Sequence, residues 1–122
     1  MKDIRFHSGV QRDINSALRH YRKESERLAD EFWVSISDAF ELIRQYPERH
    51  HLNPSGYRRL NLKRFPYNML FEELWDRVRV VVVRHNSRKP GFGTRRKWSE
   101  SGSREILTPG PHTTGPYEGC KG

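Results

Sequence analysis

The spacing of apolar residues changes once along this chain, near residue 57, and that change limits the folds it can adopt. From about residue 9 to Pro47, apolar residues recur every three or four positions, which is the spacing of one buried helix face. After residue 57, apolar and polar residues alternate, as in strands that bury one face. The sequence therefore predicts helices followed by strands, an α+β arrangement.

Two helices are expected in the first half of the chain. The first covers residues 9–24, where Ser8 and Gln11 have the form of an N-terminal capping box. Ser25 favours the start of the second helix, and Pro47 ends it because proline lacks a backbone N–H. Almost no loop separates the two helices, so we expect an antiparallel helical hairpin.

Strands are expected at the N-terminus and throughout the second half. Alternation predicts strands at 4–7, 57–63 and 67–72, and the valine run at 78–83 indicates a central strand covered on most of both faces. Residues 74–77 form the expected hairpin turn. The predicted fold is β-α-α-β-β-β, a helical hairpin packed on one face of a mainly antiparallel sheet. The first strand lies at an edge or beside the last strand, and the other face is open.

The predicted domain covers residues 1–97. Residues 98–122 are polar and rich in Gly, Pro and Ser, which predicts a disordered tail. The single cysteine, Cys120, excludes an internal disulfide and suits a reducing compartment. No apolar run is long enough for a membrane span, so the expected location is cytoplasmic, without membrane contact.

Positive charge is concentrated in the second half of this basic protein. The 122-residue chain carries a net charge of +8 at pH 7. Residues 58–97 contain twelve Lys and Arg residues and three acidic residues, whereas residues 1–57 contain nine of each. A one-sided positive field attracts nucleic-acid phosphates or an acidic protein. The expected partner is therefore an anion.

Four of these cations lie in one segment of seven residues, on the first long strand and at its end: Arg58, Arg59, Lys63 and Arg64. With no acidic residue among them, they predict a contact surface for phosphate or for an acidic protein. The alternative is a solvated strand face whose like charges prevent edge-to-edge aggregation.

Histidines are the chain's candidates for proton transfer and metal binding. His85 directly follows the valine strand, where it is either a general acid or base near neutral pH or a structural residue at the end of the sheet. His50 and His51 are adjacent in a loop, and with Cys120 remote in the tail they do not make a metal set. The sequence indicates no metal and no cofactor.

Six short phrases stand in a fixed order along the chain: Ile4–His7, Ala39–Ile43, Arg58–Leu60, Arg64–Tyr67, Leu70–Phe71 and Val82–Pro90. Together they resemble the RelE/ParE superfamily of toxins from bacterial type II toxin–antitoxin modules, over roughly residues 3–97. The resemblance implies the fold predicted above, a small acidic antitoxin as partner, and a role in plasmid stabilisation.

The superfamily contains two mechanisms. RelE-like members are ribosome-dependent endoribonucleases that cleave mRNA, whereas ParE-like members inhibit DNA gyrase and carry no catalytic set. RelE-like nucleases usually place an arginine at the start of the third strand, where this chain reads Phe65-Pro66-Tyr67. This departure favours the ParE-like reading, with the nuclease as the alternative. A non-toxic relative that binds nucleic acid or protein is the second alternative.

The resemblance also points to individual residues. Those expected to bind the target or nucleic acid are Arg58, Arg59, Lys63, Arg64, Arg84 and Arg88. Arg88, in the closing phrase, is the residue most expected to touch the target, and the alternative for it is an ion pair back to the helices. A ParE-like toxin needs no catalytic residue. In a nuclease, His85, Arg64 and Arg88 would be the catalytic groups.

Overall fold

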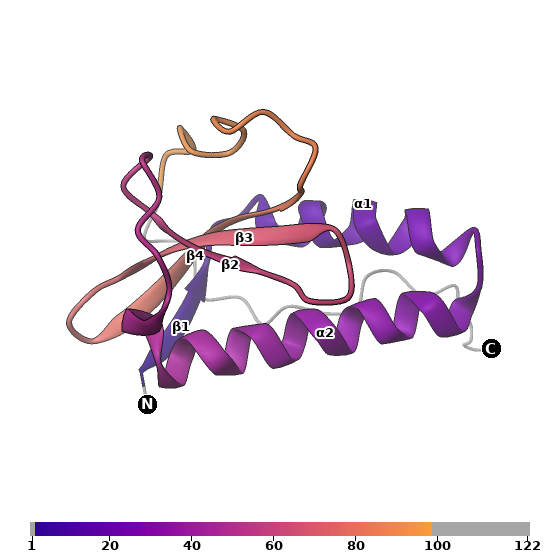
Figure 1. Ribbon diagram of the computed structural model, residues 1–122, viewed down its shortest axis with the longest axis horizontal. Coiled ribbons are helices and arrows are strands. Elements are labelled where there is room, and N and C mark those ends of the chain that lie inside the picture. The colour runs from indigo at the N-terminus through magenta and orange to yellow at the C-terminus, as the bar shows by residue number, and fades with distance from the viewer. Residues whose placement is uncertain (1, 99–122) are drawn as a thin grey trace.

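The computed structural model describes residues 2–98, in which a pair of helices packs against a sheet (Figure 1). The elements in chain order are β1 (Asp3–Phe6), α1 (Val10–Arg22), α2 (Glu26–Gln45), the short 3-10 helix η1 (Pro47–Arg49), β2 (Arg58–Asn61), β3 (Tyr67–Glu73) and β4 (Arg77–His85). The predicted α+β order is confirmed. The predicted tail, residues 98–122, lies outside the described residues apart from Trp98.

The four strands form one mixed sheet in the order β1-β4-β3-β2. Strands β2, β3 and β4 are antiparallel neighbours, and β1 is parallel to β4, so the sheet is mainly antiparallel as predicted. Strand β1 lies both at an edge and beside the final strand. The valine strand β4 is central, and its residues 80–83 are all buried.

The two long helices begin in different ways. Ser25 caps α2 as predicted, because its hydroxyl oxygen accepts a hydrogen bond at 3.0 Å from the backbone N–H three residues further on. The expected capping box at Ser8 is wrong, because Gly9 is the N-cap of α1 and no side chain caps it. His7 serves this turn instead: its Nδ1 accepts from the Gly9 N–H and its carbonyl from the Val10 N–H, both at 2.9 Å.

The helices bury their apolar faces against one face of the sheet. The ring of Phe32 on α2 meets Tyr67 on β3 edge to face, with centroids 5.0 Å apart. Phe6 on β1 meets Phe40 in the same way at 4.9 Å. Burial of one such side chain contributes about 1.5–3 kcal/mol, so these contacts fix how the helical hairpin sits on the sheet.

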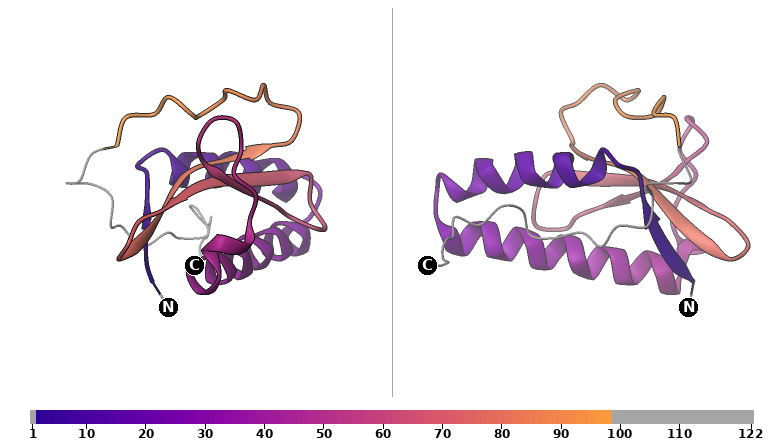
Figure 2. Two further views of the ribbon diagram at one scale, coloured as in Figure 1. Left: turned by 60° about the vertical axis from the view of Figure 1, so that its left-hand side comes forward. Right: turned by 180° about the vertical axis from the view of Figure 1, so that it is seen from behind.

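Residues 86–98, here called the strap, cross the sheet on the side away from α2 (Figure 2). The expectation of an open second face is therefore wrong over β4. Val82 is fully buried there because Gly93 of the strap packs on it. A Cβ at Gly93 would lie 2.5 Å from Val82 Cγ2, and the Gly93 φ of +82° also favours glycine. The strap can approach this closely only through glycine.

Candidate functional site

A groove of about 480 Å³ runs between α2 and the edge strand β2. Its floor is apolar and its rim is mainly basic. The floor residues are Ala39, Leu42, Leu60 and Leu62, and the charged rim residues are Arg49, Arg59, Lys63 and Arg64 together with one acidic residue, Asp38. We call it the α2/β2 groove. Leu42 is 45% exposed, so it offers apolar surface to a partner on the floor of the groove.

The four cations predicted around β2 divide between two roles. Arg59, Lys63 and Arg64 line the α2/β2 groove. Arg58 is tied to the fold instead, because its Nη1 donates a hydrogen bond to the His50 carbonyl at 2.7 Å. Lys63 is exposed and has no ion-pair partner among residues 2–98. Three of the four cations therefore lie on one surface, and the charge of Lys63 is available there to a partner.

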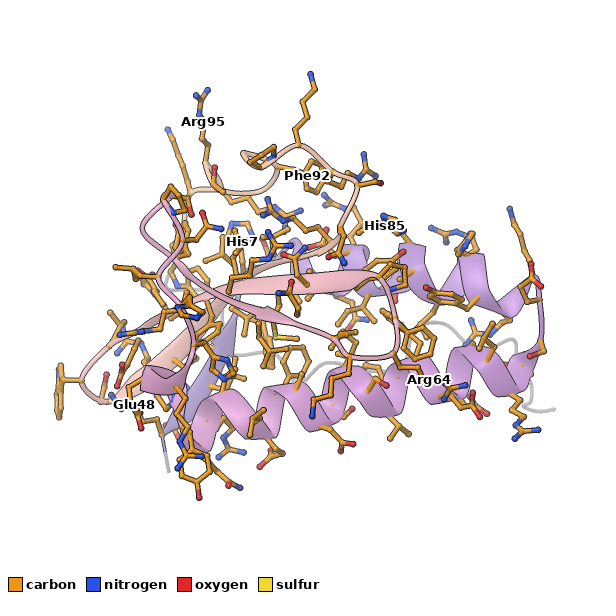
Figure 3. The ribbon with its side chains drawn as sticks, viewed as in Figure 1. His7, Glu48, Arg64, His85, Phe92 and Arg95 are labelled. Atoms are coloured by element: carbon orange, nitrogen blue, oxygen red, sulfur yellow. The ribbon has the colours of Figure 1, made fainter. Side chains whose placement is uncertain are left out.

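Arg64 already holds one acidic partner on α2. Its Nη2 donates to Glu31 Oε1 at 2.6 Å, and this hydrogen bond lowers the pKa of Glu31 below its ordinary value. The Arg64 side chain remains 60% exposed. Figure 3 shows it beside α2, and a partner carboxylate can compete there with Glu31.

A second depression, of about 500 Å³, lies between α1, the ends of β3 and β4, and the strap. We call it the α1/strap hollow, and the polar and aromatic residues that define it are Arg12, Asp13, Ser16, His20, Tyr67, Arg84, His85, Arg88, Phe92 and Arg96. It contains His85 and Arg88, whereas Arg64 lines the α2/β2 groove (Figure 3). Two of the three residues named for a nuclease thus come together, and the third lies elsewhere.

His85 is held in one orientation in the hollow. Its Nδ1 accepts a hydrogen bond from the Ser87 backbone N–H at 3.0 Å, and its ring meets the ring of Tyr67 edge to face at 5.1 Å. The proton of the neutral imidazole is therefore on Nε2. Burial raises the pKa of Tyr67, so its phenol stays protonated at neutral pH and can donate a hydrogen bond.

Arg84 lies beneath the strap and is only 3% exposed. Its Nη1 donates to the carbonyls of Pro90 at 2.7 Å and Phe92 at 2.9 Å, and its Nε donates to Asn68 Oδ1 at 3.1 Å. Burial lowers the pKa of Arg84 from its ordinary value. In this arrangement Arg84 holds the strap that carries Arg88, and its own contact with a target stays a prediction.

Arg96 joins the other end of the strap to α1. Its Nη1 and Nη2 contact the two carboxylate oxygens of Asp13 at 2.7 and 2.8 Å, and Nη1 also donates to the Val81 carbonyl at 3.0 Å. Asp13 accepts a further hydrogen bond from the Val83 N–H at 3.1 Å. The carboxylate of Asp13 thus accepts three hydrogen bonds, two from the strap and one from β4.

These features can be compared with known protein families. A family model described as the ParE toxin of the type II toxin–antitoxin system, parDE, matches residues 4–90. The chain belongs to this toxin family. The comparison with curated proteins finds no match. The matched range covers both long helices, strands β2 to β4 and all of β1 except Asp3, and it ends within the strap, before Phe92 and Arg96.

Membership of this family confirms the resemblance to the RelE/ParE superfamily. The protein is the toxin of a type II toxin–antitoxin module, and toxins of this family pair with antitoxins. The toxin presents two basic depressions, the α2/β2 groove and the α1/strap hollow, which differ in what they offer a partner.

Sequence reasoning named Arg84, His85 and Arg88 among the residues of the toxin's hollow and missed the others, including Arg12, His20 and Tyr67. Arg12 and His20 are eight residues apart on the predicted first helix, which places them roughly two turns apart on one side, so that spacing was a usable signal. No local pattern indicates which segment lies opposite them, because the strap follows more than sixty residues later. Tyr67 was predicted as a strand residue and as part of a family phrase, and not as a site residue.

Within residues 2–98, no group of three or more His, Cys, Asp or Glu side chains is arranged to hold a metal ion. None of the helices in that part of the toxin is long and apolar enough to cross a membrane. The adjacent His50 and His51 differ in environment: the His50 ring packs edge to face on Phe71 at 5.6 Å, and His51 is exposed.

Proposed function

We propose that this toxin inhibits DNA gyrase in the cytoplasm through contacts of its basic C-terminal half. The observation that carries the proposal is the match to ParE toxins, because gyrase inhibition is the mechanism that the resemblance assigns to ParE-like members. The geometry adds support. Of the three groups named for a nuclease, Arg64 lies in a different depression from His85 and Arg88, so these three do not surround one phosphate.

The same proposal includes a small acidic antitoxin that occupies the α2/β2 groove. The floor offers Leu42 and the partly buried Leu62 to apolar side chains, and the rim offers Arg59 and Lys63 to carboxylates. An amphipathic acidic segment satisfies both requirements at once. Charge complementarity therefore favours this groove as the place where the antitoxin docks.

Purified gyrase gives the first test. Added toxin is expected to inhibit supercoiling of a relaxed plasmid and to accumulate linear DNA, while a translated mRNA in a cell-free system stays intact. Cleavage of that mRNA, with gyrase unaffected, would replace the proposal by the endoribonuclease reading. An absence of both effects would favour a non-toxic binding relative.

Two substitutions separate contact from catalysis in growing cells. His85→Gln should leave toxicity largely intact, because glutamine keeps a polar group and contact needs no proton transfer. Arg88→Ala should weaken toxicity, because it removes a cation exposed on the strap. In a nuclease, by contrast, loss of a general acid or base slows the reaction about 10²–10⁴-fold. A folded but inert His85→Gln protein would therefore count against gyrase inhibition by contact.

The antitoxin test uses the product of the neighbouring gene, which we expect to encode a small acidic protein that co-purifies with the toxin. Replacing Arg59, Lys63 and Arg64 by alanine should weaken its binding about 30-fold or more. The matched control replaces Arg19, Arg95 and Lys97, three exposed cations outside the groove, and should change binding less than threefold. Equal losses in the two triple variants would show that net charge, and not the groove, determines affinity.

A further inference from the structure

The α1/strap hollow carries positive charge that its own residues do not neutralise. Asp13 is its single acidic lining residue, and that carboxylate is occupied by Arg96 and the Val83 N–H. Arg84 Nη1 donates to carbonyl groups of the strap, and its Nε donates to Asn68. Arg12 remains as a cation without an ion-pair partner among residues 2–98. The hollow therefore carries an excess of positive charge that is available to an anion.

Arg88 provides a second available cation, from the wall opposite Arg12. Its guanidinium lies 4.6 Å from the centroid of the Phe92 ring, and within the described part of the chain it forms no ion pair. The expected alternative, an ion pair from Arg88 back to the helices, is absent from residues 2–98. Because Arg12 comes from α1 and Arg88 from the strap, an anion in the hollow is approached from two sides.

Hydrogen-bond donors and aromatic surface lie beside these two cations. His85 presents Nε2–H, Tyr67 presents a protonated phenol, and His20 adds a second imidazole from α1. Phe92, which is 36% exposed, adds an aromatic ring. A strand of nucleic acid offers the matching groups: a phosphate for the cations, sugar and phosphate oxygens for the donors, and a base for the rings.

The walls of the hollow are fixed before any ligand arrives. Arg84 holds the middle of the strap through the Pro90 and Phe92 carbonyls, and Arg96 fixes its end to Asp13. Binding to a preformed site does not have to overcome the entropy cost of ordering a loop. Its volume of about 500 Å³ lies within the range of roughly 300–1,000 Å³ that is usual for small-ligand pockets.

We propose that the α1/strap hollow binds a phosphodiester group of a nucleic-acid strand, with Arg12 and Arg88 on opposite sides of the phosphate. His85 and Tyr67 donate hydrogen bonds to the strand, and Phe92 packs against an adjoining base. This site goes beyond the proposed inhibition of gyrase, because it binds the strand directly and needs no second protein. The hollow also lies apart from the α2/β2 groove, so one toxin molecule can bind an antitoxin in the groove and a nucleic-acid strand in the hollow at the same time.

The test measures fluorescence anisotropy of two labelled ten-nucleotide single strands, one RNA and one DNA of the same sequence. Arg12→Ala and Arg88→Ala should each weaken binding about tenfold and lower the salt slope of log K by about one. The matched controls are Arg19→Ala, on the same helix, and Arg95→Ala, on the same strap. Both are exposed and lie outside the hollow, and we expect each to change affinity less than twofold.

Four equal losses would overturn the proposal, because they would indicate binding to the general positive field. A selective loss with either polymer supports it, and tighter binding of the RNA shows that the 2′-hydroxyl is also recognised. Thermal unfolding of each variant separates binding from folding, and neither the Arg12 nor the Arg88 side chain forms an ion pair within residues 2–98. The assay contains no gyrase, so failure of the gyrase proposal and failure of this one are distinguishable.

Ring resonances of the histidines give an independent readout by NMR. Titration with the same unlabelled DNA strand should shift the signals of His20 and His85 and leave those of His7 and His50 nearly unchanged, because only the first two line the hollow. Equal shifts in all four rings would place the strand elsewhere on the surface and contradict the assignment.

Discussion

The α2/β2 groove and the α1/strap hollow draw on the same excess of positive charge, but they combine it with different surroundings. The groove sets its cations around exposed apolar side chains such as Leu42 and lies at the edge of the sheet. The hollow sets its cations around imidazole and phenol groups and lies between two elements that are pinned together. The first suits a protein segment with an apolar face, and the second suits a phosphate.

The comparison shows that net charge alone does not define a partner. Arg64 and Arg96 are each paired with a carboxylate, yet Arg64 stays 60% exposed and Arg96 is 19% exposed. An exposed pair is worth little and can exchange partners, whereas a largely buried pair is structural. The surroundings of each cation decide whether it is available to a ligand.

The largest expected effect comes from Asp13→Asn, which breaks the anchor of the hollow. The Asp13 side chain is 8% exposed, and its loss as a carboxylate leaves Arg96 without its partner. The free energy of unfolding should fall by about 3 kcal/mol, measured by urea denaturation. The control, Asp38→Asn, changes an exposed carboxylate of the groove and should stay within about 0.5 kcal/mol. A stable Asp13→Asn protein would show that the strap needs no anchor.

Gly93→Ala should destabilise the toxin by about 2 kcal/mol, because the new methyl group meets Val82 and the backbone φ is positive. Gly91→Ala is the matched control on the same strap. Its Cβ would lie 3.9 Å from Thr94 Oγ1, an ordinary contact, so we expect a change of less than about 0.5 kcal/mol. Thermal unfolding measures the loss of stability in each variant. Similar losses in Gly93→Ala and Gly91→Ala would mean that the strap does not pack closely on β4.

A smaller effect should mark the apolar floor of the groove. Leu42→Ala should weaken antitoxin binding by about 1 kcal/mol, or fivefold, while binding of the oligonucleotides stays unchanged. Leu52→Ala provides the control, because Leu52 is 66% exposed and lies outside the groove. Isothermal titration measures both. Loss of oligonucleotide binding in Leu42→Ala would show that the two sites are one.

The smallest effect is a dependence on pH. Because Arg64 lowers the pKa of Glu31, this pair contributes to stability above the ordinary Glu value of about 4.5, and the contribution is lost as pH falls through the lowered pKa. Arg64→Ala should therefore be less stable than the parent at pH 7, and this difference should shrink as the pH falls through the lowered pKa of Glu31. Lys63→Ala, with no such partner, should differ from the parent by the same amount across this pH range. A constant Arg64→Ala difference would exclude Glu31 as the cause.

Local patterns predicted most of the fold. The period of the apolar residues located both helices and all four strands, and Ser25 marked a helix start, because these signals depend on neighbours a few residues away. The prediction of a capping box at Ser8 was wrong because a different residue accepts the hydrogen bonds of this turn. The turn at Gly9 uses His7 as its acceptor, and a side-chain ring that folds back on its own backbone follows no simple spacing rule.

By itself, the sequence determined the order of the elements, the central position of the valine strand and the location of the positive charge. The tertiary structure decided which cations are available. Arg84 is used beneath the strap and Arg96 at a carboxylate 83 residues away, whereas Arg12 and Arg88 are left facing one hollow. The physical reason is that every cation adds equally to the net charge, whatever its position in the sequence. Contacts between distant segments decide whether that cation is paired with a carboxylate or a carbonyl group, or is left for a ligand.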